Sequence, residues 1–332
     1  TTYNVRAYAT NSAGTGYGSA VSFTTQPVLI AVLTTSAVSN IALTTATSGG
    51  TVTSDGGSTV IARGACWSTG TTPTIADSKT NDGVGTGSFT SSITGLTANT
   101  TYNVRAYATN SAGTGYGSVI SFTTPQLPVL TTSAVTDIRL TTATSGGNVT
   151  SAGSSTVTAR GVCWSTSTAP TTADSKTTDG AGTGGFTSSF TGLTRNTTYY
   201  VKAYATNSAG TAYGNEVTFT TYGLIDIDGN GYHSIIIKTQ EWMKENLKTT
   251  KYRDGSAIPN VTNATDWVNS STGAYSDFDN SQSNVAVYGR LYNWYAVVDP
   301  RNICPSGWHV PSLNEVDILI NSAGIQVYGP FY

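Results

Sequence analysis

Asp226, Asp228 and Asn230 are the residues whose spacing comes closest to a metal site. Followed by Gly231, they read Asp-x-Asp-x-Asn-Gly, which matches the start of a calcium loop in which alternate oxygens face one hard cation. Such a loop takes a glutamate at its twelfth position, where this chain has Ile237. Asp-Gly-Asn is also an ordinary hairpin turn. We favour the turn and keep calcium as the alternative; no other cofactor is expected.

Histidine and cysteine residues are too scattered to predict a zinc or catalytic centre. The two histidines are His233 and His309, and the three cysteines are Cys66, Cys163 and Cys304. A protein zinc site needs several of these residues at short spacings. The chain also has no Gly-x-Ser-x-Gly motif, phosphate loop or dinucleotide fingerprint. We therefore predict no catalytic residues and no enzyme activity.

Aromatic residues gather in the last third of the chain. Aromatic rings flanked by Asn and Asp can stack on sugar rings, but they more often form the core of a small domain. The core interpretation is favoured for Trp242, Trp267, Tyr292, Trp294, Tyr295 and Trp308. Trp267 and its neighbour Asp266 are kept as candidates for an exposed ligand-binding patch.

Composition excludes several classes of partner. Charged residues make up 10% of the 332 residues, and the net charge is -2. Such a surface would hold neither nucleic acid nor an anionic membrane. No apolar run approaches the roughly 20 residues that span a bilayer. Regular Tyr, Val, Phe and Trp residues exclude a disordered chain, and the length suits two to four domains.

A repeat of about 97 residues organises most of the chain. The segment 100–117 reads TTYNVRAYATNSAGTGYG, and closely similar segments occupy 2–18 and 197–214. This period exceeds that of solenoid repeats, so each copy should be a separate domain. The prediction is a partial repeat over 1–25, complete repeats over 31–124 and 129–221, and a different module over 224–332, which we call the C-terminal module.

Within a copy, apolar residues alternate with polar ones. Tyr199, Val201, Ala203 and Ala205 would face one way, which is the pattern of a half-buried strand. Further strands are expected at 157–164, 185–190 and 213–220, separated by Gly-rich turns. Seven short strands without a helical period predict an antiparallel β-sandwich, so the fold class is mainly β.

The repeats resemble fibronectin type III domains. Leu96 and Leu193 each lie six residues before a tyrosine, Tyr102 or Tyr199, within Gly-Leu-Thr-x-Asn-Thr-Thr-Tyr. The resemblance implies a tyrosine corner, in which the tyrosine hydroxyl bonds back to the preceding turn. An Arg-Gly-x-Cys-Trp segment stands in the middle of each copy, as in surface proteins of the Bacteroidota.

Two features of the repeats bear on how they are used. Cys66 and Cys163 occupy matching places in separate domains, so they are expected to be small buried hydrophobes and not a disulfide. The linkers Gln26-Pro27 and Pro125–Pro128 are short and stiffened by proline. Domains joined in this way are expected to stand in line as a rod.

The C-terminal module resembles the Fibrobacter succinogenes major paralogous domain. Four motifs carry the likeness: DIDGN from 226, QEWMKENLK from 240, YGRLYNWYAV from 288 and CPSGWHVPS from 304. The resemblance implies a C-type-lectin-like α+β fold, related to formylglycine-generating enzymes, whose catalytic cysteines have no counterpart here. It also implies that the module is incomplete and that Cys304 lacks its partner. A short helix is expected over 314–320 with Ser312 as its N-cap.

These observations predict a non-catalytic extracellular or cell-surface protein. The sandwiches would form a rod-like spacer, and the C-terminal module would contact a glycan or a surface protein in adhesion or surface structure. One alternative is a subunit of an extracellular filament or sheath that self-associates through strand edges, because the chain is expected to begin and end inside domains. The other is the non-catalytic part of a secreted polysaccharide-acting enzyme.

Overall fold

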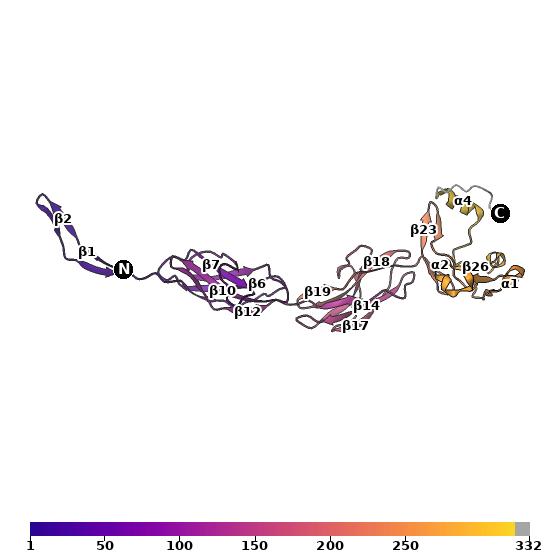
Figure 1. The fold of residues 1–332 in the computed structure, drawn as a ribbon, viewed down its shortest axis with the longest axis horizontal. Helices are drawn as coiled ribbons and strands as arrows, with labels where there is room; N and C mark the ends of the chain where they lie inside the picture. The colour runs from indigo at the N-terminus through magenta and orange to yellow at the C-terminus, as the bar shows by residue number, and fades with distance from the viewer. Residues whose placement is uncertain (323–332) are drawn as a thin grey trace. The chain divides into compact units, whose positions relative to one another are not determined.

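The computed structural model describes residues 1–322, which fall into two compact units. The first unit consists of Thr1–Leu127 together with Gly153–Thr156 and Asn207–Gly210, and the second contains the other described residues. Strands dominate both units (Figure 1), so the mainly β fold class is confirmed. Within the described residues, no helix is long and apolar enough to cross a membrane.

Residues 1–25 form a single bent ladder. β1 (Thr2–Val5) pairs with β4 (Val21–Thr24), and β2 (Tyr8–Asn11) pairs with β3 (Gly14–Tyr17). Tyr3 stacks on Phe23 with ring centroids 5.6 Å apart, yet each ring is about half exposed. No second sheet covers this ladder in the part of the chain that the structure describes.

The first sandwich has seven strands, the last of which is broken in two. They are β5 (Val32–Thr35), β6 (Ala46–Ser54), β7 (Ala62–Ser68), β8 (Ser78–Lys79), β9 (Gly87–Ile93), β10 (Thr101–Asn110), β11 (Gly113–Tyr116) and β12 (Ile120–Thr123). One sheet has the order β5-β6-β9, and the other has β8-β7-β10 with β11 and β12 both paired to β10. This strand order is that of a fibronectin type III sandwich.

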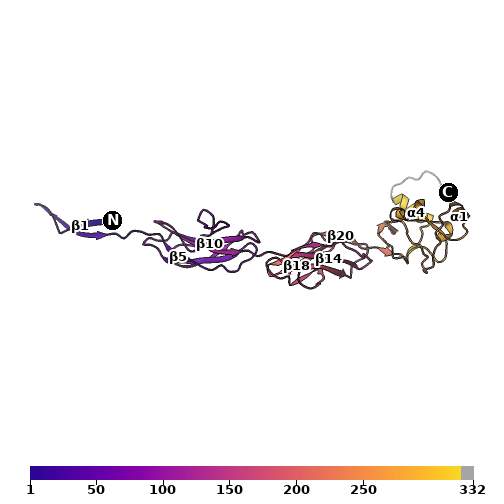
Figure 2. The ribbon, with the colours of Figure 1, turned by 60° about the horizontal axis from the view of Figure 1, so that its bottom comes forward.

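The second sandwich repeats this arrangement. Its strands are β13 (Val129–Thr132), β14 (Ala143–Ser151), β15 (Ala159–Ser165), β16 (Ser175–Lys176), β17 (Gly184–Phe190), β18 (Thr198–Asn207), β19 (Gly210–Tyr213) and β20 (Val217–Thr220). The sheets have the orders β13-β14-β17 and β16-β15-β18, and β19 and β20 both pair with β18. Figure 2 labels β14 and β18, one strand from each sheet.

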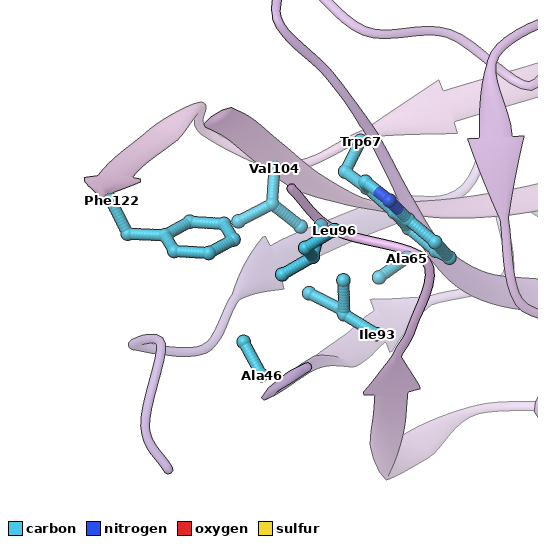
Figure 3. Close-up of a cluster of buried hydrophobic side chains, with 7 residues drawn as sticks. All are labelled: Ala46, Ala65, Trp67, Ile93, Leu96, Val104 and Phe122. Carbon is cyan, nitrogen blue, oxygen red and sulfur yellow. The ribbon is translucent and has the colours of Figure 1, made fainter. Parts of the chain in front are cut away.

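The core of each sandwich is made by inward-facing residues of both sheets, and the four predicted to share one face, Tyr199, Val201, Ala203 and Ala205, are all buried. Figure 3 shows Ala65, Trp67, Val104 and Phe122 from one sheet and Ala46 and Ile93 from the other, gathered in one cluster with Leu96. The second sandwich buries the matching cluster: Ala143, Val162, Phe190, Leu193, Tyr199, Val201 and Phe219. Each large side chain buried in this way stabilises the fold by about 1.5–3 kcal/mol.

The predicted strand at 213–220 is interrupted at Gly214. A side chain there would collide with Thr132, whose backbone nitrogen lies 2.7 Å from the position of a Cβ. Thr132 Oγ1 accepts a hydrogen bond from the Ala203 backbone at 2.9 Å, so β13 lies at the edge of the other sheet where β19 ends. The close approach of β13 therefore divides the last strand.

The C-terminal module is built from short elements around a small core. They are β21 (Leu224–Ile225), β22 (Gly231–Tyr232), β23 (Ser234–Ile237), β24 (Gln240–Met243), α1 (Ala264–Asn269), β25 (Tyr275–Asp277), η1 (Phe278–Asn280), η2 (Gln282–Asn284), α2 (Val285–Tyr288), β26 (Arg290–Tyr292), α3 (Trp294–Val297) and α4 (Leu313–Ser322). The strands pair as three two-stranded hairpins or ladders, β21-β22, β23-β24 and β25-β26. The core contains Tyr252, Ile258, Tyr275, Ala296, Ile303 and Cys304.

The helix predicted over 314–320 is α4. Its first turn has a capping box, because Ser312 Oγ accepts a hydrogen bond from the Glu315 backbone while Glu315 Oε2 accepts one from the Ser312 backbone at 2.8 Å. The predicted N-cap, Ser312, is therefore confirmed.

Candidate functional site

The loop predicted as a turn or a calcium site connects β21 to β22. Asp226 Oδ1 accepts hydrogen bonds from the backbone of Asp228 and Asn230, at 3.0 and 2.8 Å. Asp226 Oδ2 accepts one from the Tyr232 hydroxyl at 2.6 Å and one from the Asn230 amide. Burial, with the bond to Asp226 adding to it, raises the pKa of Tyr232. Asp226 therefore binds donors of its own loop with both oxygens.

The carboxylate of Asp228 binds the chain that follows the β23–β24 hairpin. Its Oδ2 accepts from the backbone and the hydroxyl of Thr250, and its Oδ1 lies 3.0 Å from the Lys251 ammonium. Burial opposes ionisation, but these bonds lower the pKa of Asp228 below its ordinary value. In residues 1–322, no group of three or more His, Cys, Asp or Glu side chains is placed to hold a metal ion. The geometry is that of a bonded turn, and calcium binding stays an untested prediction.

Each histidine is paired with a glutamate. His233 Nδ1 lies 2.6 Å from Glu245, and His309 Nε2 lies 2.9 Å from Glu315. Burial would raise the pKa of Glu245, but the bonds from His233 lower it overall. The backbone and hydroxyl of Ser312, with His309, lower the pKa of Glu315 to about 2. Both glutamates are therefore ionised at neutral pH.

The predicted aromatic core is wrong for two of its members. Tyr292 and Trp308 pack against the buried cluster, but Trp294 is 70% exposed and Tyr295 45% exposed. The reason is local, since the single-turn helix α3 turns Ala296 inward and the two aromatic residues outward. An exposed aromatic surface therefore lies at α3, where both aromatic residues had been assigned to the core.

Trp267 and Asp266 lie together on α1. Trp267 is half-buried and Asp266 is exposed. Asn263 caps this helix by accepting bonds from the backbone of Thr265 and Asp266. The proposed ligand-binding role of Trp267 and Asp266 stays a prediction.

A groove of about 620 Å³ lies along the C-terminal module. It is lined by the turn and second strand of the β23–β24 hairpin with the chain up to Leu247, which we call the first wall, and by residues 306–309, 311 and Glu315, which we call the second wall. Arg195 of the second sandwich also lines it. Arg253 holds the second wall, because its guanidinium donates to the backbone oxygens of Cys304, Pro305 and Trp308. We refer to this feature as the groove.

Two tryptophans line the groove, Trp242 in the first wall and Trp308 in the second. Trp242 and Trp308 are both half-buried and both reach the groove. Trp308 packs against the core, and Trp242 Nε1 donates to Gln240 Oε1 at 3.2 Å. Packing and this bond fix the two rings while leaving part of each accessible from the groove.

Three polar side chains that line the groove each have one polar atom in a hydrogen bond within the protein. Glu241 Oε1 accepts from the Ser234 hydroxyl at 2.6 Å, and Asn246 Nδ2 donates to the Tyr288 backbone at 3.0 Å. Within residues 1–322, Gln240 Nε2, Glu241 Oε2 and Asn246 Oδ1 have no hydrogen-bond partner in the protein. The groove therefore presents one donor and two acceptors from side chains that are already oriented.

Comparison with known proteins decides what the module is. Residues 235–328 match the family model of the Fibrobacter succinogenes major domain. The C-terminal module is such a domain. No curated protein matches the chain.

Two solved structures are similar to part of the chain at low identity. The FN1–FN3 domains of chicken CNTN1 are 16% identical, cover 66% of this chain and 75% of theirs, with a TM-score of 0.28. A two-domain fibronectin type III segment from chicken tenascin is 15% identical, covers 56% of this chain and 97% of its own, with a TM-score of 0.25. The assignment of the sandwiches rests on the strand order and the tyrosine corners described here.

The tyrosine corners form as the family resemblance implied. The backbone of Thr97 donates to the Tyr102 hydroxyl at 3.1 Å, and that of Thr194 donates to the Tyr199 hydroxyl at 2.9 Å. Leu193 is buried next to the second of these corners.

All three cysteines are free and buried, as predicted for Cys66 and Cys163. Burial raises the pKa of each thiol, in the case of Cys163 to about 11. Thiols in this state are poor nucleophiles at neutral pH.

Sequence reasoning missed the polar part of the major domain's groove. Gln240, Glu241 and Asn246 were not predicted as site residues, and Trp242 and Trp308 were assigned to the core. A signal was present, because Gln240–Lys248 and Cys304–Ser312 are two of the four motifs that identify the major domain. These two motifs form the two walls of the groove.

Proposed function

We propose that this chain is a non-catalytic part of an extracellular or cell-surface protein that works by contact. In this proposal, the sandwiches act as a spacer and the major domain is the contact end, in adhesion or surface structure. The observation that carries the proposal is the groove. It lies on the major domain, where fixed aromatic and polar side chains are accessible to a ligand.

The sandwiches support the spacer role because they use the same side chains for the same internal bonds. Arg63 donates to the backbone of 85–87, and Arg160 donates to that of 182–184. The hydroxyls of Tyr107 and Tyr204 each donate to a threonine backbone oxygen at 2.6 Å. Selection on a spacer preserves such fold-holding residues without creating a separate site in each copy.

A half-buried aspartate in each sandwich gives a second example of this internal bonding. Asp82 accepts from the hydroxyls of Thr80 and Ser91, and Asp179 accepts from those of Thr177 and Ser188. Their partners Ser91 and Ser188 are fully buried, and hydrogen-bonded networks of polar groups hold a fold. They support a structural use of the repeats.

The non-catalytic assignment is supported by the state of the reactive groups. The cysteines are buried with raised pKa values. The two histidines are engaged with glutamates: Glu245 is bonded by the ring and the backbone of His233, and Glu315 is bonded by His309 and Ser312. These arrangements hold structure and do not place an activated nucleophile in the groove.

The proposed function is tested by location and attachment. Antibodies against the sandwiches should label intact cells that produce the protein. Beads coated with the whole chain should attach to at least one of a panel of insoluble polysaccharides and extracellular proteins, whereas albumin-coated beads should not. Labelling only after permeabilisation, or attachment to nothing in the panel, would contradict the proposal.

A further inference from the structure

We propose that the groove of the major domain binds a neutral oligosaccharide, with Trp242 and Trp308 as stacking platforms and Gln240, Glu241 and Asn246 as hydrogen-bonding groups. This inference rests on the proposed contact function and names its site and its ligand class. The volume of about 620 Å³ lies within the range of small-ligand sites and suits a few sugar rings.

The aromatic side chains fit the apolar faces of sugar rings. A pyranose presents a face of C–H groups, which packs against an aromatic ring as other apolar surfaces do. Trp308 is held by the core and Trp242 by its bond to Gln240. Because the rings are fixed before a ligand arrives, little conformational entropy is lost on binding.

The polar side chains fit the hydroxyls at the edge of the same rings. A sugar hydroxyl both donates and accepts, so it needs partners of both kinds. Gln240 Nε2 can donate to it, while Glu241 Oε2 and Asn246 Oδ1 can accept from it. Each of these side chains is held by a bond from its other polar atom, to Trp242, Ser234 and Tyr288 respectively.

The charges of the groove argue against an anionic ligand. Three glutamates, Glu241, Glu245 and Glu315, line it together with one arginine, Arg195. Glu245 and Glu315 are ionised because their hydrogen bonds lower their pKa values. A uronate, a phosphate or a nucleic acid would bring a further negative charge to this wall.

Two of these carboxylates, those of Glu245 and Glu315, do not favour a cationic peptide. Glu245 is bonded by the backbone and ring of His233. Glu315 is bonded by Ser312 and His309. Since their partners are supplied by the protein, a lysine or arginine side chain would have to displace existing bonds. A neutral, hydroxyl-rich ligand needs no such exchange.

The test is a binding titration of the whole chain with neutral hexasaccharides: cello-, xylo-, manno- and N-acetylglucosamine oligomers. Oligogalacturonate and a polylysine peptide serve as charged probes. We expect at least one neutral oligomer to bind and to change tryptophan fluorescence, and neither charged probe to bind as tightly. Binding of no neutral oligomer, or tighter binding of a charged probe, would overturn the ligand class.

Variants then test the location. Trp242→Ala and Gln240→Ala should each weaken the binding of the neutral oligomer about tenfold or more, and Trp242→Phe should retain most of it. Trp294→Ala is the matched control, because Trp294 is an exposed tryptophan of the same domain that does not line the groove. Far-UV circular dichroism and thermal melts check that each variant is folded. Equal affinity of Trp242→Ala and the unsubstituted chain would overturn the groove as the site.

The two proposals fail in different ways. If coated beads attach to a surface but no neutral oligomer binds in the groove, the contact function stands and the ligand inference is wrong. If the beads attach to nothing and no oligomer binds, both are wrong.

Discussion

At the scale of single residues, the tyrosine corner is the clearest case of one side-chain hydroxyl that stabilises a turn. Tyr199 accepts from the Thr194 backbone, whereas no bond is made by the hydroxyl of its neighbour Tyr200 within the described chain. The two tyrosines lie on opposite faces of β18. They therefore form a matched pair for mutation.

We expect Tyr199→Phe to lower the free energy of unfolding of the second sandwich by about 1 kcal/mol, because a hydrogen bond of this kind contributes about that much. In a domain of about 100 residues this corresponds to a fall of roughly 4–8 °C in Tm. Differential scanning calorimetry of the whole chain measures it. Tyr200→Phe should leave the transition unchanged, and an equal fall for both variants would refute the role of the corner.

The loop at 226–230 gives a prediction about metal removal. Because the oxygens of Asp226 and Asp228 already bind donors of the protein, we expect EDTA to leave the Tm of the major domain unchanged. Adding 1 mM calcium to the chelated protein should also have no effect. A rise of several degrees on adding calcium would instead establish the calcium alternative.

Asp228 also gives a prediction about pH. The folded pKa of Asp228 is lower than its unfolded value, which is about 3.9. Its contribution to stability is therefore present above about pH 4, and it is lost as the pH falls through the folded pKa. Asp228→Asn should have a lower Tm than the unsubstituted chain at pH 6, and the difference should shrink toward pH 2. A difference independent of pH would contradict the assignment.

At the scale of elements, each sandwich forms hydrogen bonds with the segment that precedes its first strand. The backbone of Leu29 donates to Gly56, and the amide of Asn110 donates to the backbone oxygens of Leu29 and Asp55. The second sandwich repeats the bond from Asn207 to Gln126. Gly56 must be a glycine at this contact, because a Cβ would lie 2.0 Å from the Leu29 oxygen.

Substitutions at Gly56 and Gly57 distinguish the stability that comes from this contact from the cost of backbone strain. Both have positive φ, +70° and +86°, but a Cβ on Gly57 would meet nothing within 4 Å. Gly57→Ala should lower the free energy of unfolding by about 1–2 kcal/mol, because an alanine there would have to adopt the left-handed conformation. Gly56→Ala should cost more and should also speed hydrogen exchange of the Leu29 amide. If urea unfolding gives the same loss of unfolding free energy for both variants, and hydrogen exchange of the Leu29 amide is unchanged, the segment before the first sandwich is not held at Gly56.

Much of the element layout was predictable from sequence, and the exceptions have physical causes. Period-two alternation located β15, β17 and β18, because one face of each strand packs on the core. The break after Tyr213 was not predictable, since it arises from the approach of Thr132, which is distant in sequence. The outward orientation of Trp294 follows from which residue of a single-turn helix faces the core. A hydrophobicity pattern over four residues does not determine this.

At the scale of the whole molecule, the repeat period predicted the strand-built domains, and motif spacing predicted the major domain. The groove could not be predicted in this way. Its walls come from residues some 60 positions apart, and no pattern in either segment indicates that both segments line one groove. Whether the division into a partial repeat, two repeats and a module describes independent folding domains stays a prediction.

The central claim is that contact is made by the major domain and not by the sandwiches. The most direct test is attachment of chain-coated beads to a surface that they bind, in the presence of Fab fragments against one part or the other. A Fab that binds the groove of the major domain should abolish attachment, and a Fab that binds the first sandwich should leave it intact. Attachment that is blocked only by the Fab against the sandwich would contradict the account.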